Sequence, residues 1–245
     1  MTSLLLLTLA INPVPASEKF LGAKYVVSPL GEGEGKDPDP RLRTDAFDCL
    51  TFVETAMAMT LAPEKPQDVL DRIRYEGDTI SYGERNHVME AQWLPRNIEK
   101  GFLKDVTKQY GGDAVVHVTK VIGDEQWNAK SGKELGLERE HQARGEFGLD
   151  VIPAKAALEK LKSAPEGTVV VVVRADRPRL VTRITHVGFL LHKKKGVFMR
   201  HASRTFGRVV DEDLATYLQR NLGYAKWTVE GFALFEVQAP AAPAP

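Results

Sequence analysis

Five consecutive valines, residues 169–173, constrain the fold of this chain more than any other stretch. β-Branched residues favour extended backbone, and a strand that is apolar on both faces must be buried on both sides. Strand-like segments surround the valines in the last third of the chain, whereas helical patterns dominate the part before it. This order predicts an α+β fold with a mostly antiparallel β-sheet. A chain of 245 residues is long enough for one such domain, expected over residues 17–238.

The segments on either side of the lysine-rich turn at residues 193–196 predict a β-hairpin. If the turn centres on residues 194 and 195, opposing residues have numbers that add up to 389. His186 then lies opposite Ser203 and diagonal to His201, so both histidines share one face of the sheet. Such neighbours lie about 5–8 Å apart, close enough for one imidazole to hold the other. A turn with an even sum would place them on opposite faces.

The single cysteine, Cys49, opens an apolar helical pattern that Pro63 ends. Asp48 is a good N-cap residue for this helix. A loop rich in glycine and proline, residues 28–45, leads into it, and long loops of this kind are often functional. The N–H groups and the positive end of a helix lower the pKa of a thiol and can stabilise an oxyanion. The pattern therefore predicts an activated nucleophile at Cys49.

The charge balance excludes some classes of partner. Lys and Arg number 33, and Asp and Glu also number 33, so the formal net charge is zero. No general basic bias points to nucleic acid or to an anionic membrane surface. A lone cysteine cannot form an internal disulfide, and in an exported protein an unpaired thiol is a liability unless it has a function. A buried, inert cysteine is the alternative.

The N-terminus resembles part of a secretory signal. Residues 4–11 are almost wholly apolar, and small residues follow at 14–16, which predicts a signal segment over 1–16 with cleavage after Ala16. The run is too short to span a bilayer. No basic residue precedes Lys19, so a truncated start or a buried strand are the alternatives. We expect export to the periplasm or the exterior, and a disordered Ala/Pro tail over 239–245.

The remaining segments are assigned by periodicity and by turn residues. Residues 124–148 are polar and interrupted by glycines, and no regular structure is assigned there. Helices are expected at 67–75, at 87–100 with a bend near Pro95, at 153–162 and at 211–221, and a strand is expected at 114–122.

Two other interpretations of the histidines compete with catalysis. Histidines on strands are often merely half-exposed residues, but two on one face, together with a cysteine at a helix start, favour a catalytic site. A metal site would need ligands at regular spacing, such as His-Glu-x-x-His, and the chain has no such pattern.

Several motifs resemble the NlpC-like superfamily of papain-fold cell-wall hydrolases, and in particular its N-acetylmuramoyl-L-alanine amidase-like branch. The matching segments are FDCLTFVE at 47–54, THVG at 185–188, HAS at 201–203, LGAKYV at 21–26, IRYEG at 73–77 and YGERNH at 82–87, followed by Trp93 and Asn97. Lys24 replaces the proline that is usual in the family's leading segment. The stretch 124–148 also matches poorly.

The resemblance implies a papain-like fold in which the nucleophile helix packs on the sheet. It implies Cys49 as nucleophile, His186 as base and His201 as orienting residue, with His87 as the rival for that last role. It also implies that Tyr25 approaches the sulfur and that Asp48 lines the cleft or caps the helix. Further substrate contacts are expected from a short polar and aromatic stretch, namely Tyr82, Arg85, His87 and Trp93.

The function expected from this resemblance is hydrolysis of the amide between N-acetylmuramic acid and L-alanine in peptidoglycan. Two alternatives stay open: a γ-D-glutamyl-diamino acid endopeptidase acting on stem peptides, and a peptidoglycan-binding module without activity. The expected partner is peptidoglycan or a muropeptide, with no nucleic acid and no stable membrane insertion. No cofactor or metal is expected.

Overall fold

The valine run lies at the centre of the sheet in the computed structural model, which describes residues 10–240. Strand β7 (Val169–Arg174) is buried along its whole length and lies between β8 (Ile184–Lys193) and β11 (Val229–Gln238). Val169, Val171 and Val173 pack into one core, and Val170 and Val172 pack into a second core on the other face. The prediction of a strand buried on both faces is therefore confirmed.

The strands described form one sheet in the order β3-β2-β10-β9-β8-β7-β11-β6-β5, and β1 and β4 also pair with β11. All of these pairs are antiparallel except β2 with β3. The expectation of an α+β fold with a mostly antiparallel sheet is confirmed. The other strands are β1 (Ala10–Ile11), β2 (Lys24–Tyr25), β3 (Ala46–Phe47), β4 (Leu103–Asp105), β5 (Val116–Ile122), β6 (Gly145–Pro153), β9 (Gly196–Ser203) and β10 (Arg208–Asp213).

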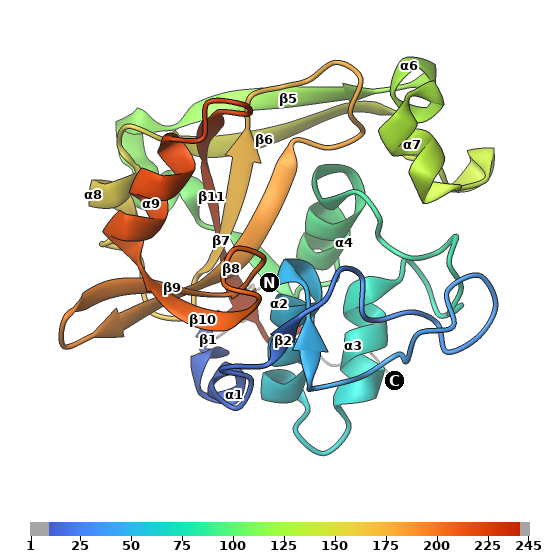
Figure 1. The fold of residues 1–245 in the computed structure, drawn as a ribbon, viewed down its shortest axis with the longest axis horizontal. Coiled ribbons are helices and arrows are strands. Elements are labelled where there is room, and N and C mark those ends of the chain that lie inside the picture. The colour runs from blue at the N-terminus through green and yellow to red at the C-terminus, as the bar shows by residue number, and fades with distance from the viewer. Residues whose placement is uncertain (1–9, 241–245) are drawn as a thin grey trace, which may run out of the picture.

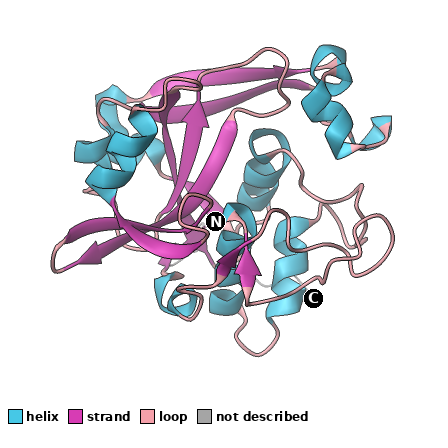
Figure 2. Ribbon diagram, in the orientation of Figure 1, coloured by secondary structure: helices cyan, strands magenta, loops and turns pink. Residues whose placement is uncertain are grey.

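Helices cover both faces of the sheet (Figure 1). Helix α2 (Cys49–Leu61) packs on one face, where the rings of Phe52 and Phe189 meet edge to face at 5.7 Å. Helices α8 (Ala157–Leu161) and α9 (Leu214–Leu222) cover the other face, on the left of Figures 1 and 2. The other helices are α1 (Val14–Glu18), α3 (Pro66–Arg74), α4 (Leu94–Glu99), α5 (Thr107–Gly111), α6 (Asp124–Asn128) and α7 (Lys130–Leu135). Short π and 3-10 turns occupy Met89–Trp93, Gly112–Ala114 and Arg139–His141.

The register of the predicted hairpin is confirmed. Phe189 pairs with Arg200 and Lys193 with Gly196, so opposing residues add up to 389. The close approach of β8 to β9 explains the glycine at 188. A Cβ atom there would lie 2.6 Å from the backbone oxygen of Arg200 and 2.9 Å from the Cβ of His201. Position 188 therefore admits no side chain while His201 keeps its place.

Three secondary-structure predictions were wrong in part. Residues 211–213 end strand β10, and α9 begins only at Leu214, because Asp213 caps it by accepting a hydrogen bond from the backbone N–H of Thr216 at 2.9 Å. The segment 153–162 ends strand β6 and forms only the short helix α8. The stretch 124–148 contains α6, α7 and the start of β6, although no regular structure was expected there.

The first described residues are integrated into the fold. Strand β1 pairs with the end of β11, and the buried guanidinium of Arg200 donates to the backbone oxygen of Val14 at 3.2 Å and to Ser17 Oγ at 3.1 Å. The predicted cleavage point after Ala16 thus falls inside helix α1, and residues 10–11 form a short strand in which Ala10 is exposed and Ile11 half-buried. Residues 1–9 of the predicted signal and 241–245 of the predicted tail lie outside the described residues. Between residues 10 and 240 no helix is long and apolar enough to cross a membrane.

We predict that Ser17→Ala lowers the free energy of unfolding by about 1–3 kcal/mol, because it leaves a buried guanidinium N–H without its acceptor. Ser163→Ala is the matched control. Both serines donate to a carbonyl three residues earlier at 2.7 Å, but Ser163 is exposed and accepts no buried cation. The control should change the free energy by less than about 0.5 kcal/mol. Urea denaturation measures both, and equal effects would contradict a structural role for this segment.

Candidate active site

Helix α2 begins at Cys49 because Asp48 caps it. Asp48 Oδ1 accepts a hydrogen bond from the backbone N–H of Thr51 at 2.8 Å, and Thr51 Oγ1 accepts one from the backbone N–H of Asp48 at 3.0 Å. The second carboxylate oxygen of Asp48 accepts from the backbone N–H of Ser28, at the start of the predicted loop. The predicted N-cap is therefore confirmed, and it places the only cysteine of the chain in the first turn.

The sulfur of Cys49 faces strand β8. The backbone N–H groups of Val187, Leu50 and Cys49 itself lie near enough to the sulfur to lower its pKa, and Val187 directly follows His186. Cys49 is only partly exposed and packs against the core that α2 shares with the sheet. The helix start and the histidine strand thus meet at one point.

The two predicted histidines contact each other. His186 Nε2 lies 2.7 Å from His201 Nδ1, and their rings meet edge to face with centroids 4.8 Å apart. Their shared face of the sheet is the one that α9 covers, where the Tyr217 ring packs against both imidazoles. The predicted juxtaposition of His186 and His201 is confirmed, and His87 makes no contact with this pair.

A buried carboxylate stands behind His201. Glu212 Oε2 lies 3.2 Å from His201 Nε2 and 2.6 Å from Arg220 Nη2, and Glu212 is 6 % exposed. Although burial raises the pKa of Glu212, the hydrogen bonds from His201 and Arg220 hold it below its usual range. The residue is therefore ionised at neutral pH and can only accept hydrogen bonds.

This carboxylate sets the tautomers of both histidines. Because Glu212 can only accept, Nε2 of His201 carries the proton and its Nδ1 is an acceptor. Nδ1 of His201 then accepts a hydrogen bond from Nε2–H of His186. The proton-accepting nitrogen of His186 is therefore Nδ1. A line of hydrogen bonds across strands β8, β9 and β10 leaves His186 with one basic nitrogen.

Burial keeps both Cys49 and His186 neutral. Burial, and after it the Asp48 carboxylate, raise the pKa of the Cys49 thiol to about 12, although three backbone N–H groups act to lower it. Burial also holds the pKa of His186 well below its usual 6.5, aided by His201 and by the positive charges of Arg220 and Arg174. The N–H groups at the helix start lower the pKa of Cys49 as expected, but burial outweighs them, so the pKa is raised rather than lowered. The resting pair is thiol and neutral imidazole.

Two cavities lie close by, one lined by His186 and the other by the two neighbours of Cys49. One of about 480 Å³ is lined by His186 and His201 together with residues from β7, α9 and the turn after β9. The other, of about 250 Å³, is lined by Asp48 and Leu50, which flank Cys49, and by Tyr82, Arg85 and His87. Four of the predicted substrate-contact residues, Asp48, Tyr82, Arg85 and His87, therefore lie around one cavity.

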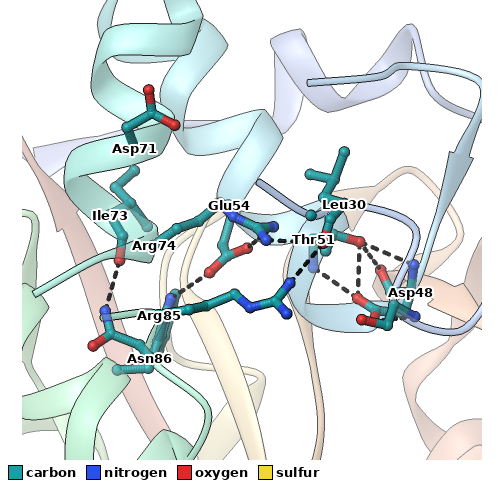
Figure 3. A network of polar contacts seen from close by, with 12 residues as sticks. Leu30, Asp48, Thr51, Glu54, Asp71, Ile73, Arg74, Arg85 and Asn86 are labelled. Carbon is teal, nitrogen blue, oxygen red and sulfur yellow. Dashed lines mark hydrogen bonds and ion pairs between the residues drawn. The ribbon is translucent and has the colours of Figure 1, made fainter. Parts of the chain in front are cut away.

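The polar network behind the second cavity is shown in Figure 3. Arg74 and Arg85 converge on the backbone oxygen of Leu30, at 3.0 and 2.8 Å, and Arg74 also pairs with Glu54 at 3.3 Å. Arg85 is further paired with Asp37 at 2.8 Å. These charges are largely satisfied within the protein. The network holds the loop that starts at Ser28 against α2.

The remaining predicted site residues have different environments. Tyr25 is half-buried, and its pKa is raised to about 12, first by burial and then by the nearby Cys49 and Asp48. His87 Nε2 lies 2.6 Å from the backbone oxygen of Tyr82, and burial lowers its pKa to about 4. Trp93 is fully buried and donates to Glu54 at 2.9 Å. It has no exposed surface with which to touch a substrate. Its contact with Glu54 instead stabilises helix α2.

Three residues of the site were missing from the sequence analysis: Glu212, Tyr217 and Arg220. Glu212 was placed in an expected helix at 211–221, whereas it lies on strand β10 beside His201. A strand signal at 208–213, with two valines before the acidic residues, could have found it. Within the described residues no group of three or more His, Cys, Asp or Glu is arranged to hold a metal ion.

A family model described as N-acetylmuramoyl-L-alanine amidase-like, named AmiA-like, matches residues 15–224. The chain belongs to the AmiA-like family. The resemblance to the amidase-like branch is thus confirmed. A search of curated proteins found no match.

Solved structures share the fold of this AmiA-like chain. A Legionella pneumophila protein of the DUF1460 family is 27 % identical, with a TM-score of 0.82 over 93 % of this chain and 88 % of its own. An N-acetylmuramoyl-L-alanine amidase from Bacteroides uniformis is 22 % identical, with a TM-score of 0.69 over 93 % of this chain and 98 % of its own. A putative xylanase from Bacteroides fragilis is also 22 % identical, with a TM-score of 0.71 over 90 % and 98 % of the two chains.

We predict that Cys49 reacts with iodoacetamide more slowly than glutathione at pH 7, because its raised pKa reduces the thiolate fraction. The rate should climb as the pH rises through 9 toward the pKa of about 12. Mass spectrometry reports the reaction without ambiguity, since the chain has one cysteine. The chain unfolded in urea is the control and should react like the free thiol. Faster reaction of the folded protein at pH 7 would instead indicate a thiolate–imidazolium pair.

Proposed function

We propose that the chain is a cysteine amidohydrolase that cleaves the amide between N-acetylmuramic acid and L-alanine in peptidoglycan fragments. The observation that carries the proposal is the line of contacts from Glu212 through His201 to His186, together with the influence of the next backbone N–H on that strand, Val187, on the Cys49 sulfur. A hydrogen-bonded base that is itself oriented by a third group is the usual arrangement for activating a nucleophile. The packing of helix α2 on the sheet, which the resemblance to papain-fold hydrolases implies, and the AmiA-like family support the same activity.

The reaction begins with a neutral thiol. As the Cys49 sulfur attacks the carbonyl carbon, its proton moves to Nδ1 of His186, and the carbon–sulfur bond forms. Backbone N–H groups at the start of α2 stabilise the oxyanion. The resulting imidazolium is stabilised by His201 and by the charge of Glu212 behind it. Coupling the proton transfer to the attack avoids forming an isolated thiolate in a buried site.

The second half of the reaction releases both products. His186 returns its proton to the departing amine nitrogen as the carbon–nitrogen bond breaks, which leaves a thioester on Cys49. Water then attacks the thioester with Nδ1 of His186 as base, and the acid product leaves with the thiol restored. The substrate lies outside the cytoplasm in this proposal, which agrees with the expected export of the chain.

We predict that purified protein releases the intact stem peptide from muropeptides, and that Cys49→Ala abolishes turnover with an unchanged circular dichroism spectrum. Liquid chromatography with mass spectrometry identifies the products. A free sugar with an intact stem identifies the amidase. A stem truncated after D-glutamate would identify the endopeptidase instead. Turnover that persists in Cys49→Ala, or no turnover by the wild type, would overturn the proposal and leave the binding module.

We predict that Glu212→Gln lowers kcat by about 10- to 100-fold with KM within about twofold, because a neutral amide no longer fixes the tautomer of His201. The ¹⁵N chemical shifts of His186 and His201 should show mixed tautomers in this variant and single tautomers in the wild type. Glu230→Gln is the control, since Glu230 also pairs with an arginine, Arg183, but lies on β11 away from the site. Unchanged kcat and ¹⁵N shifts in Glu212→Gln would contradict the assigned role.

The pKa of His186 also sets the acidic limit of the rate. Because the unprotonated imidazole is the active form and its pKa lies well below 6.5, kcat/KM should stay flat as the pH falls from 7 through 6.5. A plot of kcat/KM against pH tests this directly. A decline centred at 6.5 would contradict the buried, neutral state of His186.

A further inference from the structure

The larger cavity beside His186 carries positive charge that the protein does not neutralise. Three arginines line it, Arg174, Arg204 and Arg220, and no Asp or Glu is among its lining residues. Arg220 is paired with Glu212 behind the histidines. Over residues 10–240, Arg174 and Arg204 have no carboxylate within ion-pair distance. The smaller cavity differs, because Arg74 and Arg85 are paired there.

Arg174 is the unusual member of this set, because it is both buried and without a counter-ion. It is 9 % exposed, and its partners are all neutral: Thr185 Oγ1 at 2.9 Å, Asn221 Oδ1 at 3.2 Å and the backbone oxygen of Trp227. A guanidinium has five N–H donors, so these contacts leave some of them unused. Burial of a charge without a partner opposes folding unless a ligand supplies the opposite charge.

A second unpartnered donor lines the same cavity. Tyr217 is 1 % exposed, and its hydroxyl has no hydrogen-bond partner in the described protein. Buried tyrosine hydroxyls usually find a partner. Burial raises the pKa of Tyr217, so the group stays a neutral O–H donor at neutral pH. Helix α9 brings this donor, and β7 brings Arg174, to one cavity that His186 also lines.

We infer that this cavity is an anion subsite that binds a carboxylate of the substrate close to the cleaved amide. Arg174 and the Tyr217 hydroxyl are its buried donors, and Arg204 adds charge at the exposed rim. The inference rests on the proposed function and extends it. In a stem peptide, D-glutamate is linked through its side chain, which leaves its α-carboxylate free beside the L-alanine. That carboxylate is the group of the proposed substrate that fits these donors.

The test measures binding rather than turnover. Isothermal titration calorimetry uses the Cys49→Ala protein with the tripeptide L-Ala-γ-D-Glu-L-Lys and with its analogue that carries an α-carboxamide on the glutamate. We expect the free carboxylate to bind about 10- to 100-fold more tightly. Arg174→Gln in this background should reduce the preference to less than about threefold. Tyr217→Phe and Arg204→Gln should each weaken it, and Arg174→Lys should keep part of it.

Arg177→Gln is the matched control, because Arg177 lies close by and stacks on the same Trp227 ring but does not line the cavity. It should keep the full preference. Circular dichroism checks that each variant is folded, and Tyr217→Phe and Arg204→Gln decide the question if Arg174→Gln does not fold. The inference is overturned if neither peptide binds, if both bind equally, or if the preference survives all of these substitutions. If the wild-type protein shows no turnover but the Cys49→Ala protein keeps the preference for the free carboxylate, the subsite stands and only the proposed hydrolysis is rejected.

Discussion

The buried carboxylate of Glu212 is the group on which the rest of the site depends. It is held between His201 and Arg220, and an ionised carboxylate there can only accept hydrogen bonds. Because Glu212 can only accept, the proton of His201 lies on Nε2, and His201 Nδ1 accepts from Nε2–H of His186. The basic nitrogen of His186 is therefore Nδ1. The fold makes the arrangement possible because β8, β9 and β10 are consecutive in the sheet, so each supplies one side chain to the same face. Arg220 on α9 neutralises the charge from the covering helix.

Burial decides the protonation state of the reacting pair. A helix N-terminus stabilises a negative charge by about 0.3–1 kcal/mol, which corresponds to less than one pKa unit. Burial raises the pKa of Cys49 from 9.0 to about 12, so it outweighs the helix end. The same burial lowers the pKa of His186, and the two shifts favour the same neutral state. In the proposed reaction, the N–H groups at the start of α2 therefore act mainly when the oxyanion forms, because only then is there a full negative charge beside them.

Local patterns were sufficient to predict the nucleophile helix and the histidine pair. Asp48, Cys49 and the spacing of apolar residues define the start of α2, and the parity of the hairpin follows from its turn. Glu212 was missed because its contact with His201 depends on pairing β10 with β9, and acidic residues before an apolar helix also suit a helix start. The helices within 124–148 depend on distant packing, since Trp127 and Leu137 share a small core with Val88 and Val181. The residue pattern within 124–148 gives no sign of these distant packing partners.

The two cavities near Cys49 and His186 differ in whether the arginines that line them are paired with carboxylates of the protein. Paired arginines stabilise the fold, whereas an unpaired arginine can bind an anionic ligand. Around the smaller cavity, Arg85 is paired with Asp37, and Arg74 with Glu54, so these guanidinium groups hold the loop against α2 in the absence of any ligand. Around the larger cavity, Arg174 forms hydrogen bonds only with neutral groups, so no carboxylate offsets the cost of removing its positive charge from water. A paired arginine gains little from a new anion, whereas an unpaired one gains a full ion pair in a site already shielded from water. In the proposed reaction, electrostatics alone would therefore orient an acidic substrate with its anionic group on the His186 side of the site.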